Sequence, residues 1–162
     1  MNDAPPEVRL TLGDRDVRLD WTDDQGQPQS RSLPVGLTLL AQMHRFSQPV
    51  NALALEAAIE TIEDAVMPLA SQMAVGAVLV VSNDTLPEGL LPALGISAAN
   101  PSAAAFGLDA LEAAFTELAA LAQGRPQTQA NIPATPDFAA ALLVLREAMH
   151  HLRLPRARVT GA

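Results

Sequence analysis

Lysine, cysteine and tyrosine are absent from this chain of 162 residues, and aromatic residues make up only 3% of it. Without lysine there is no Schiff-base nucleophile and no lysine-containing phosphate loop. Without cysteine there are no disulfides, thiolate metal sites or thiol nucleophiles. The sequence also lacks a Gly-x-Ser-x-Gly elbow. These absences exclude several enzyme classes and predict no cofactor.

Positive charge is missing from a long internal stretch. Residues 46–124 contain nine carboxylates and no arginine, whereas residues 125–162 contain five arginines and two acids. The net charge of −8 makes nucleic acid an unfavourable partner, because an acidic chain repels the phosphate backbone. The acids of the middle segment must therefore find cations in the flanking segments, in a partner or in solvent.

Long apolar runs are missing as well. The longest, Ala74–Val81, has about eight residues, far fewer than the ~20 that span a bilayer. The N-terminal residues lack the basic and apolar segments of a signal peptide. We therefore expect a bacterial, cytoplasmic protein with no membrane contact. Its length fits a single domain over residues 1–162, with flexible ends at about 1–6 and 155–162.

A period-two alternation marks the first third of the chain. Val8, Leu10 and Leu12 alternate with polar residues, and Val17, Leu19 and Trp21 do the same after a turn. Together with a third extended stretch, this predicts two or three antiparallel strands, with Trp21 in the core. A valine-rich run at about 74–82 predicts a further strand. We expect it to join the N-terminal strands rather than to begin a parallel sheet, because no second strand follows it in the sequence.

Helical periodicity marks the remainder. Leucine and alanine stripes predict four to five amphipathic helices that begin near Pro34, Pro49, Thr85, Asn100 and Pro136. Helices that follow the strands along the chain are typical of an α+β fold. We therefore predict an N-terminal antiparallel sheet with Ala/Leu-rich helices covering one of its faces.

Charge segregation supports a non-catalytic interaction or assembly protein as the main functional hypothesis. On the long helix, one acidic face is expected from Glu56, Glu60, Glu63 and Asp64, where no cation lies at i,i+4 to offset the repulsion. The C-terminal tail supplies Arg153, Arg156 and Arg158, and arginine binds carboxylates in a bidentate manner. The acidic face is then either simply solvated or a contact surface for a protein partner or a second copy, which would give a homodimer.

The alternative hypothesis is a small-molecule enzyme or binding protein. Asn83, Asp84 and Thr85 directly follow the predicted buried strand, where ligands often bind in folds with parallel strands. The same residue types also form ordinary turns and N-caps. In this hypothesis the acid–base candidates are His44, His150 and Asp84.

A third hypothesis is a helical metal protein. Glu147 and His150 lie three residues apart, so both project from one face of the last helix, a spacing that di-iron bundles use. Such sites need a second Glu-x-x-His motif, which the sequence lacks. The ordinary interpretation is that Glu147 pairs with an arginine and that the histidines suit the carboxyl end of the helix dipole.

Overall fold

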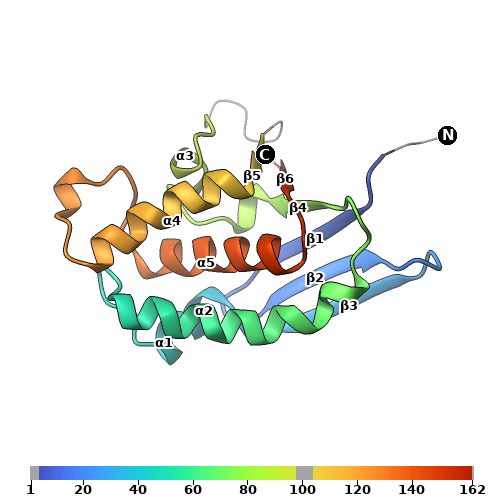
Figure 1. The fold of residues 1–162 in the computed structure, drawn as a ribbon, viewed down its shortest axis with the longest axis horizontal. Helices are drawn as coiled ribbons and strands as arrows, with labels where there is room; N and C mark the ends of the chain where they lie inside the picture. The colour runs from blue at the N-terminus through green and yellow to red at the C-terminus, as the bar shows by residue number, and fades with distance from the viewer. Residues whose placement is uncertain (1–3, 98–103, 162) are drawn as a thin grey trace.

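The computed structural model describes residues 4–97 and 104–161. Within them the strands are β1 (Glu7–Leu12), β2 (Val17–Thr22), β3 (Pro28–Leu33), β4 (Val78–Ser82), β5 (Ala105–Gly107) and β6 (Arg156–Thr160). The α-helices are α1 (Leu37–Met43), α2 (Ala52–Val66), α3 (Leu90–Ala93), α4 (Leu108–Ala122) and α5 (Pro136–His151). The fold is α+β, and its strands form one mixed sheet in the order β3-β2-β1-β4-β6-β5 (Figure 1).

The N-terminal strands form the predicted antiparallel meander. β1 pairs with β2, where Leu10 lies opposite Leu19, and β2 pairs with β3, where Trp21 lies opposite Gln29. Val8, Leu10 and Leu12 are buried, whereas Arg9 between them is exposed. The alternation therefore works as expected, because successive side chains of a strand point to opposite faces.

The sheet is not confined to the N-terminus, and in this respect the prediction was too narrow. β4 lies parallel to β1, with Leu10 opposite Val81, and β6 lies parallel to β4, with Leu79 opposite Ala157. β4 does join the N-terminal strands, but it also begins a parallel half of the sheet. It is shorter than the expected strand, because Gly76 has a positive φ of 78° and Val75 is 100% exposed.

The C-terminal segment, expected to be a flexible end, contains β6. Ala157 and Val159 are buried, while Arg156 and Arg158 are exposed on the other face of the sheet. Thr160 also donates a hydrogen bond from its Oγ1 to the carbonyl of Val81, at 3.3 Å. This strand was missed because the pattern is five residues long and two of those residues are arginines.

Two of the expected helices differ in the structure. Thr85 belongs to a 3-10 turn, Asn83–Thr85, and α3 covers only Leu90–Ala93, because Gly89 before it adopts a left-handed φ of 85°. The start expected near Asn100 lies outside the described residues, and α4 begins at Leu108, after β5. The other boundaries agree more closely, and α2 passes into a 3-10 helix at Met67–Gln72, where Pro68 is an early residue.

α5 forms the centre of the helical layer. It packs against α1, α2 and α4, and Figure 1 shows it between the last two. Nearly every residue from Phe138 to Met149 is buried, including the alanines at 139–141, which allow close approach of neighbouring helices. Thr135 caps it as predicted, accepting a hydrogen bond from the amide of Phe138 at 3.3 Å. Among the described residues no helix has the length and apolar character needed to cross a membrane.

Candidate functional site

The carboxyl ends of the parallel strands form a candidate ligand site, and 'edge' below means the side of the sheet at which these strand ends lie. β1 and β4 are parallel neighbours, so their carboxyl ends lie at the same edge. From β1 the chain continues to β2 on one side, and from β4 it continues toward β6 on the other. In many open sheets ligands bind outside the carboxyl ends of the parallel strands.

A tight turn follows β4 at this edge. Thr85 donates from its Oγ1 to the carbonyl of Ser82 at 3.0 Å, and the amide of Leu86 donates to the carbonyl of Asn83 at 3.2 Å. These hydrogen bonds satisfy the Thr85 hydroxyl within the turn, so Thr85 is a structural residue here. Asn83 is half-buried and Asp84 is exposed.

A cavity of about 450 Å³ lies beside the turn. Its walls are Asn83, Leu86, Pro87, Glu88, Gly89, Leu91 and Pro92. Among these lining residues the polar side chains are the amide of Asn83 and the carboxylate of Glu88, and none is cationic. The cavity is therefore a mainly apolar space with one neutral and one acidic hydrogen-bonding group. Of the three predicted ligand-binding residues, only Asn83 lines it.

Gly161, directly after β6, lies close to the turn that follows β4. A Cβ at Gly161 would lie 3.2 Å from the Ser82 Oγ and 3.8 Å from the Asp84 Oδ2, and the φ of Gly161 is +85°. Glycine is favoured where the backbone must approach a neighbour this closely in a left-handed conformation. The ends of β4 and β6 therefore meet at the turn, a feature that sequence reasoning did not find because it did not predict β6.

The β1–β2 turn lies at the same edge and is tied to α1. The carbonyls of Gly13, Asp14 and Arg15 accept hydrogen bonds from the amides of Leu37, Leu39 and Gly36, at 2.9, 2.9 and 3.1 Å. These three amides at the start of α1 are thereby occupied by the turn and are not available to an anionic ligand. This contact was not predicted, since it joins segments whose pairing depends on the whole sheet.

The predicted acid–base histidines do not line the cavity. His44 is the C-cap residue of α1, and its Nε2 lies 2.9 Å from the Thr61 Oγ1 on α2. His150 is exposed near the end of α5 and stacks on His151, with the ring centroids 4.8 Å apart. The structure therefore brings neither histidine to the turn after β4, and Asp84 and Glu88 are the acidic groups nearest to it in sequence.

Glu147, by contrast, belongs to a buried charge network that joins three helices. It is 1% exposed, and its Oε1 accepts from Arg146 at 2.6 Å while its Oε2 lies 3.1 Å from the His151 Nε2. Arg146 also pairs with Glu112 on α4 at 3.1 Å, and His151 with Glu63 on α2 at 3.3 Å. Burial raises the pKa of the Glu147 carboxyl, against the opposing effect of Arg146.

The residues of the metal hypothesis, Glu147 and His150, lie in or beside this network. Ligand atoms of Glu147, His150 and His151 lie within 4.8 Å of one another, which is compatible with a shared ion. However, both Glu147 oxygens already have partners, and the Arg146 guanidinium occupies the position next to one of them. A cation would have to replace these contacts, so the arrangement is better described as an ion-pair network than as a metal site.

The predicted interaction residues separate in the structure. Glu56, Glu60 and Asp64 are exposed on α2 and have no ion-pair partner within the described part of the chain, whereas Glu63 turns toward His151. Arg158 pairs with Glu7 on β1, and Arg156 and Arg153 are exposed. The tail arginines therefore do not neutralise the acidic helix within the chain.

The fold and this edge define a class: an α+β domain with a mixed sheet, a helical layer and a crevice at the carboxyl ends of its parallel strands. No protein-family model matches the chain, and no curated protein is significantly similar to it in sequence. Solved structures with this fold include the Aquifex aeolicus Ppx/GppA phosphatase (TM-score 0.69, 11% identity, 99% of this chain and 54% of that one). Another is an exopolyphosphatase from Cytophaga hutchinsonii (TM-score 0.68, 12% identity, 98% and 54%). The likeness concerns the fold, and this chain spans about half the length of these neighbours.

Proposed function

We propose that the chain is a small-molecule-binding domain whose ligand lies in the cavity beside Asn83, just past the carboxyl end of β4. The observation that carries the proposal is the size of this cavity, about 450 Å³, which is typical of ligand sites, together with its place directly after a buried parallel strand. Solved structures with this fold include a phosphatase and an exopolyphosphatase, which supports a role in binding or converting a ligand.

The chemistry of the lining favours an uncharged organic ligand over a bare phosphate. Leu86, Leu91 and the prolines offer apolar contact, while Asn83 and Glu88 can accept hydrogen bonds from ligand N–H or O–H groups. A phosphate would meet the carboxylate of Glu88, and no cationic side chain is present among the described residues that line the cavity. Heterocycles with an amino group, such as nucleobases and nucleosides, fit these requirements.

A thermal-shift panel of nucleosides, free nucleobases, inorganic phosphate and polyphosphate tests this proposal. We expect at least one uncharged compound to raise the melting temperature, and the rise to be lost in Asn83→Ala and reduced in Glu88→Gln. Matched controls are Asn131→Ala and Glu56→Gln, which replace exposed residues outside the cavity. A panel without any shift, a shift that survives Asn83→Ala, or stabilisation by polyphosphate alone would contradict the proposal.

A second candidate function, partner binding, rests on the exposed side of α2. Leu53 and, just after the helix, Met67 are 78% and 53% exposed. Between them lie Glu56, Glu60 and Asp64, which have no ion-pair partner among the described residues. An acidic surface with apolar ends suits a basic partner, and the exposed arginines of β6 make a second copy of this chain such a partner. Sedimentation at low salt should then detect a dimer that Glu60→Arg weakens and Glu60→Arg with Arg156→Glu restores. A monomer at every concentration and salt would rule out this self-association.

A further inference from the structure

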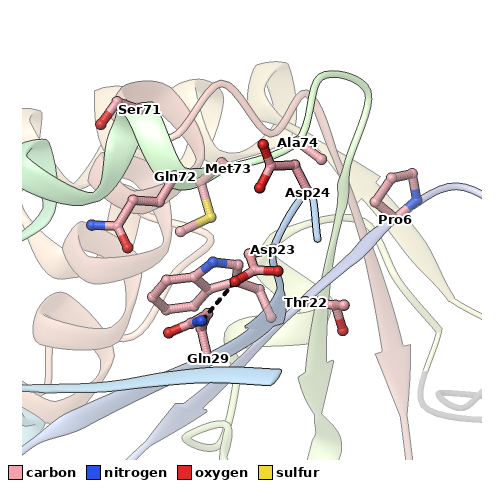
Figure 2. Close-up of a pocket in the computed structure, with 10 residues that line it drawn as sticks. Pro6, Thr22, Asp23, Asp24, Gln29, Ser71, Gln72, Met73 and Ala74 are labelled. Carbon is pink, nitrogen blue, oxygen red and sulfur yellow. Dashed lines mark hydrogen bonds between the residues drawn. The ribbon is translucent and has the colours of Figure 1, made fainter. Parts of the chain in front are cut away.

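A second, larger cavity lies at the opposite edge of the sheet. Its volume is about 730 Å³, and it is lined by Pro6, Trp21, Thr22, Asp23, Asp24, Gln29, Ser71, Gln72, Met73 and Ala74. Pro6 directly precedes β1 and residues 71–74 precede β4, so this is the amino end of the parallel strands. Figure 2 shows the carboxylates of Asp23 and Asp24, the thioether of Met73 and the amide of Gln29 gathered around this space.

Trp21 supplies a hydrogen-bond donor that has no acceptor within the described part of the chain. Its side chain is 6% exposed, and its Nε1 is buried with no hydrogen-bond partner, the one such side-chain nitrogen or oxygen among the described residues. An unsatisfied buried donor costs about 1–3 kcal/mol, and native structures rarely retain one without a reason. A ligand acceptor that reaches the indole N–H from this cavity would remove that cost.

Asp23 supplies a fixed negative charge next to this indole. Its Oδ1 accepts from the amides of Gln25 and Gln27 at 3.0 and 2.8 Å, and its Oδ2 accepts from the Gln29 Nε2 at 2.7 Å. The hydrogen bond from Gln27, opposed by partial burial, is the main reason that the pKa of Asp23 is lowered. The carboxylate is therefore both ionised and held in one orientation before any ligand arrives.

The cavity has no charge to balance this acid. No cationic side chain is present among the described residues that line it, and Asp24 adds a second, exposed carboxylate. The nearest basic residue along β1, Arg9, follows Val8, the residue opposite Trp21, and it lines a neighbouring cavity rather than this one. An anion is therefore disfavoured, and a cation that also contacts an aromatic ring is favoured.

We propose that this cavity binds a small organic cation, an ammonium or guanidinium compound that carries a hydroxyl or carbonyl group within a few bonds of its charge. The cation lies against Trp21 and is neutralised by Asp23 and Asp24, and the oxygen accepts the indole N–H. Gln29, Gln72 and Ser71 line the same cavity and provide further polar contacts. The site is separate from the cavity beside Asn83, with which it shares no lining residue.

The proposal is directly measurable because Trp21, the single tryptophan of the sequence, lines this cavity and supplies all of the tryptophan fluorescence. The probes are choline, ethanolamine and argininamide, each compared with inorganic phosphate and with the carbon analogue of choline that has no charge. We expect at least one cation to change the fluorescence in a saturable manner and the uncharged analogue and phosphate to have no such effect. Equal binding of the uncharged analogue, or no saturable change with any cation, would overturn the proposal.

Asp23→Asn is the decisive variant, because the amide oxygen can still accept the two backbone hydrogen bonds while the charge is lost. Binding of the cation should weaken about tenfold or more, the usual value of a charge-assisted contact. Asp14→Asn is the matched control, since Asp14 occupies the β1–β2 turn at the other edge; it should leave binding unchanged, as should Asn83→Ala. Undiminished binding in Asp23→Asn would place the cation elsewhere and refute the assignment.

Discussion

The buried pair Arg146–Glu147 gives the sharpest prediction on stability. Replacing Arg146 by methionine keeps an unbranched apolar side chain but leaves Glu147, whose side chain is 2% exposed, without its guanidinium. Breaking a buried pair from one side typically costs about 3–5 kcal/mol. The carboxyl can avoid most of this penalty by taking up a proton, so the cost depends on pH.

The size of this dependence follows from the ordinary pKa of glutamate, which is 4.5. Each pH unit above that value adds about 1.4 kcal/mol to the cost of protonation. The charge penalty in Arg146→Met is therefore limited to about 3.4 kcal/mol at pH 7 and about 0.7 kcal/mol at pH 5. A smaller loss of about 0.5–1 kcal/mol is independent of pH, because Arg146 also lies 4.1 Å from the centre of the Phe115 ring.

Removing the acid instead should cost less. In Glu147→Gln the amide oxygen still accepts from Arg146, which keeps Glu112 and Phe115 as partners, so we expect a loss of about 1 kcal/mol at pH 7. The sign of the pH effect is fixed by the raised pKa of Glu147. The folded state binds the proton more tightly, so stability is highest below the ordinary pKa and falls as pH rises toward the raised value. Glu147→Gln should remove this fall.

Urea unfolding followed by Trp21 fluorescence at pH 5 and pH 7 measures these differences. The double variant Arg146→Met with Glu147→Gln should be more stable at pH 7 than Arg146→Met alone, because the uncompensated charge is gone. Glu112→Gln is the control, since Glu112 is 43% exposed and its ion pair should contribute less than about 1 kcal/mol. An Arg146→Met penalty that is the same at both pH values, or a double variant without rescue, would refute the reasoning.

Three further predictions concern other parts of the fold. Asn51→Ala removes the cap of α2, whose side chain accepts from the Ala54 amide at 2.8 Å, and should cost about 1 kcal/mol by urea unfolding; no loss would mean that the cap is dispensable. Leu142→Ala opens a cavity beneath a fully buried side chain of α5 and should cost about 2–5 kcal/mol by the same measurement. Asp23, with a lowered pKa, contributes stability that is present above its ordinary value of 3.8 and is lost as pH falls below it. Asp23→Asn should therefore flatten the acid end of the stability curve, and an unchanged curve would contradict the hydrogen bonds assigned to this carboxylate.

Local patterns explain why part of the fold was predictable. The β1–β3 meander follows from the alternation of Val17, Leu19 and Trp21 with polar residues, and the last helix follows from Thr135, Pro136 and its apolar stripe. Each of these signals is contained within a few consecutive residues. The parallel pairing of β4 with β1 and β6 joins segments about seventy residues apart or more, and no local pattern specifies a partner at that distance.

The candidate sites likewise contain some residues that local sequence indicates and others that only the tertiary structure brings in. Asn83 was indicated by its place after a valine-rich strand, but Gly161 and the β1–β2 turn join that edge only when the parallel strands pair. The cavity beside Trp21 was not predicted, because alternation assigns Trp21 to the core without showing that its indole nitrogen lacks a partner. The short helix predicted from Thr85 begins later, at Leu90, because Gly89 before it adopts a left-handed conformation.

The acidic stretch between Arg45 and Arg125 shows what the sequence determines by itself and what depends on tertiary structure. The sequence by itself determined that these nine carboxylates cannot pair among themselves, since the segment contains no cation. Tertiary structure decided which of them obtain partners: α5 places Arg146 beside Glu112 and His151 beside Glu63, and leaves Glu56 and Glu60 in water. The physical reason is that ion pairs act over a few ångströms, and only the packing of α5 between α2 and α4 brings those charges within that range.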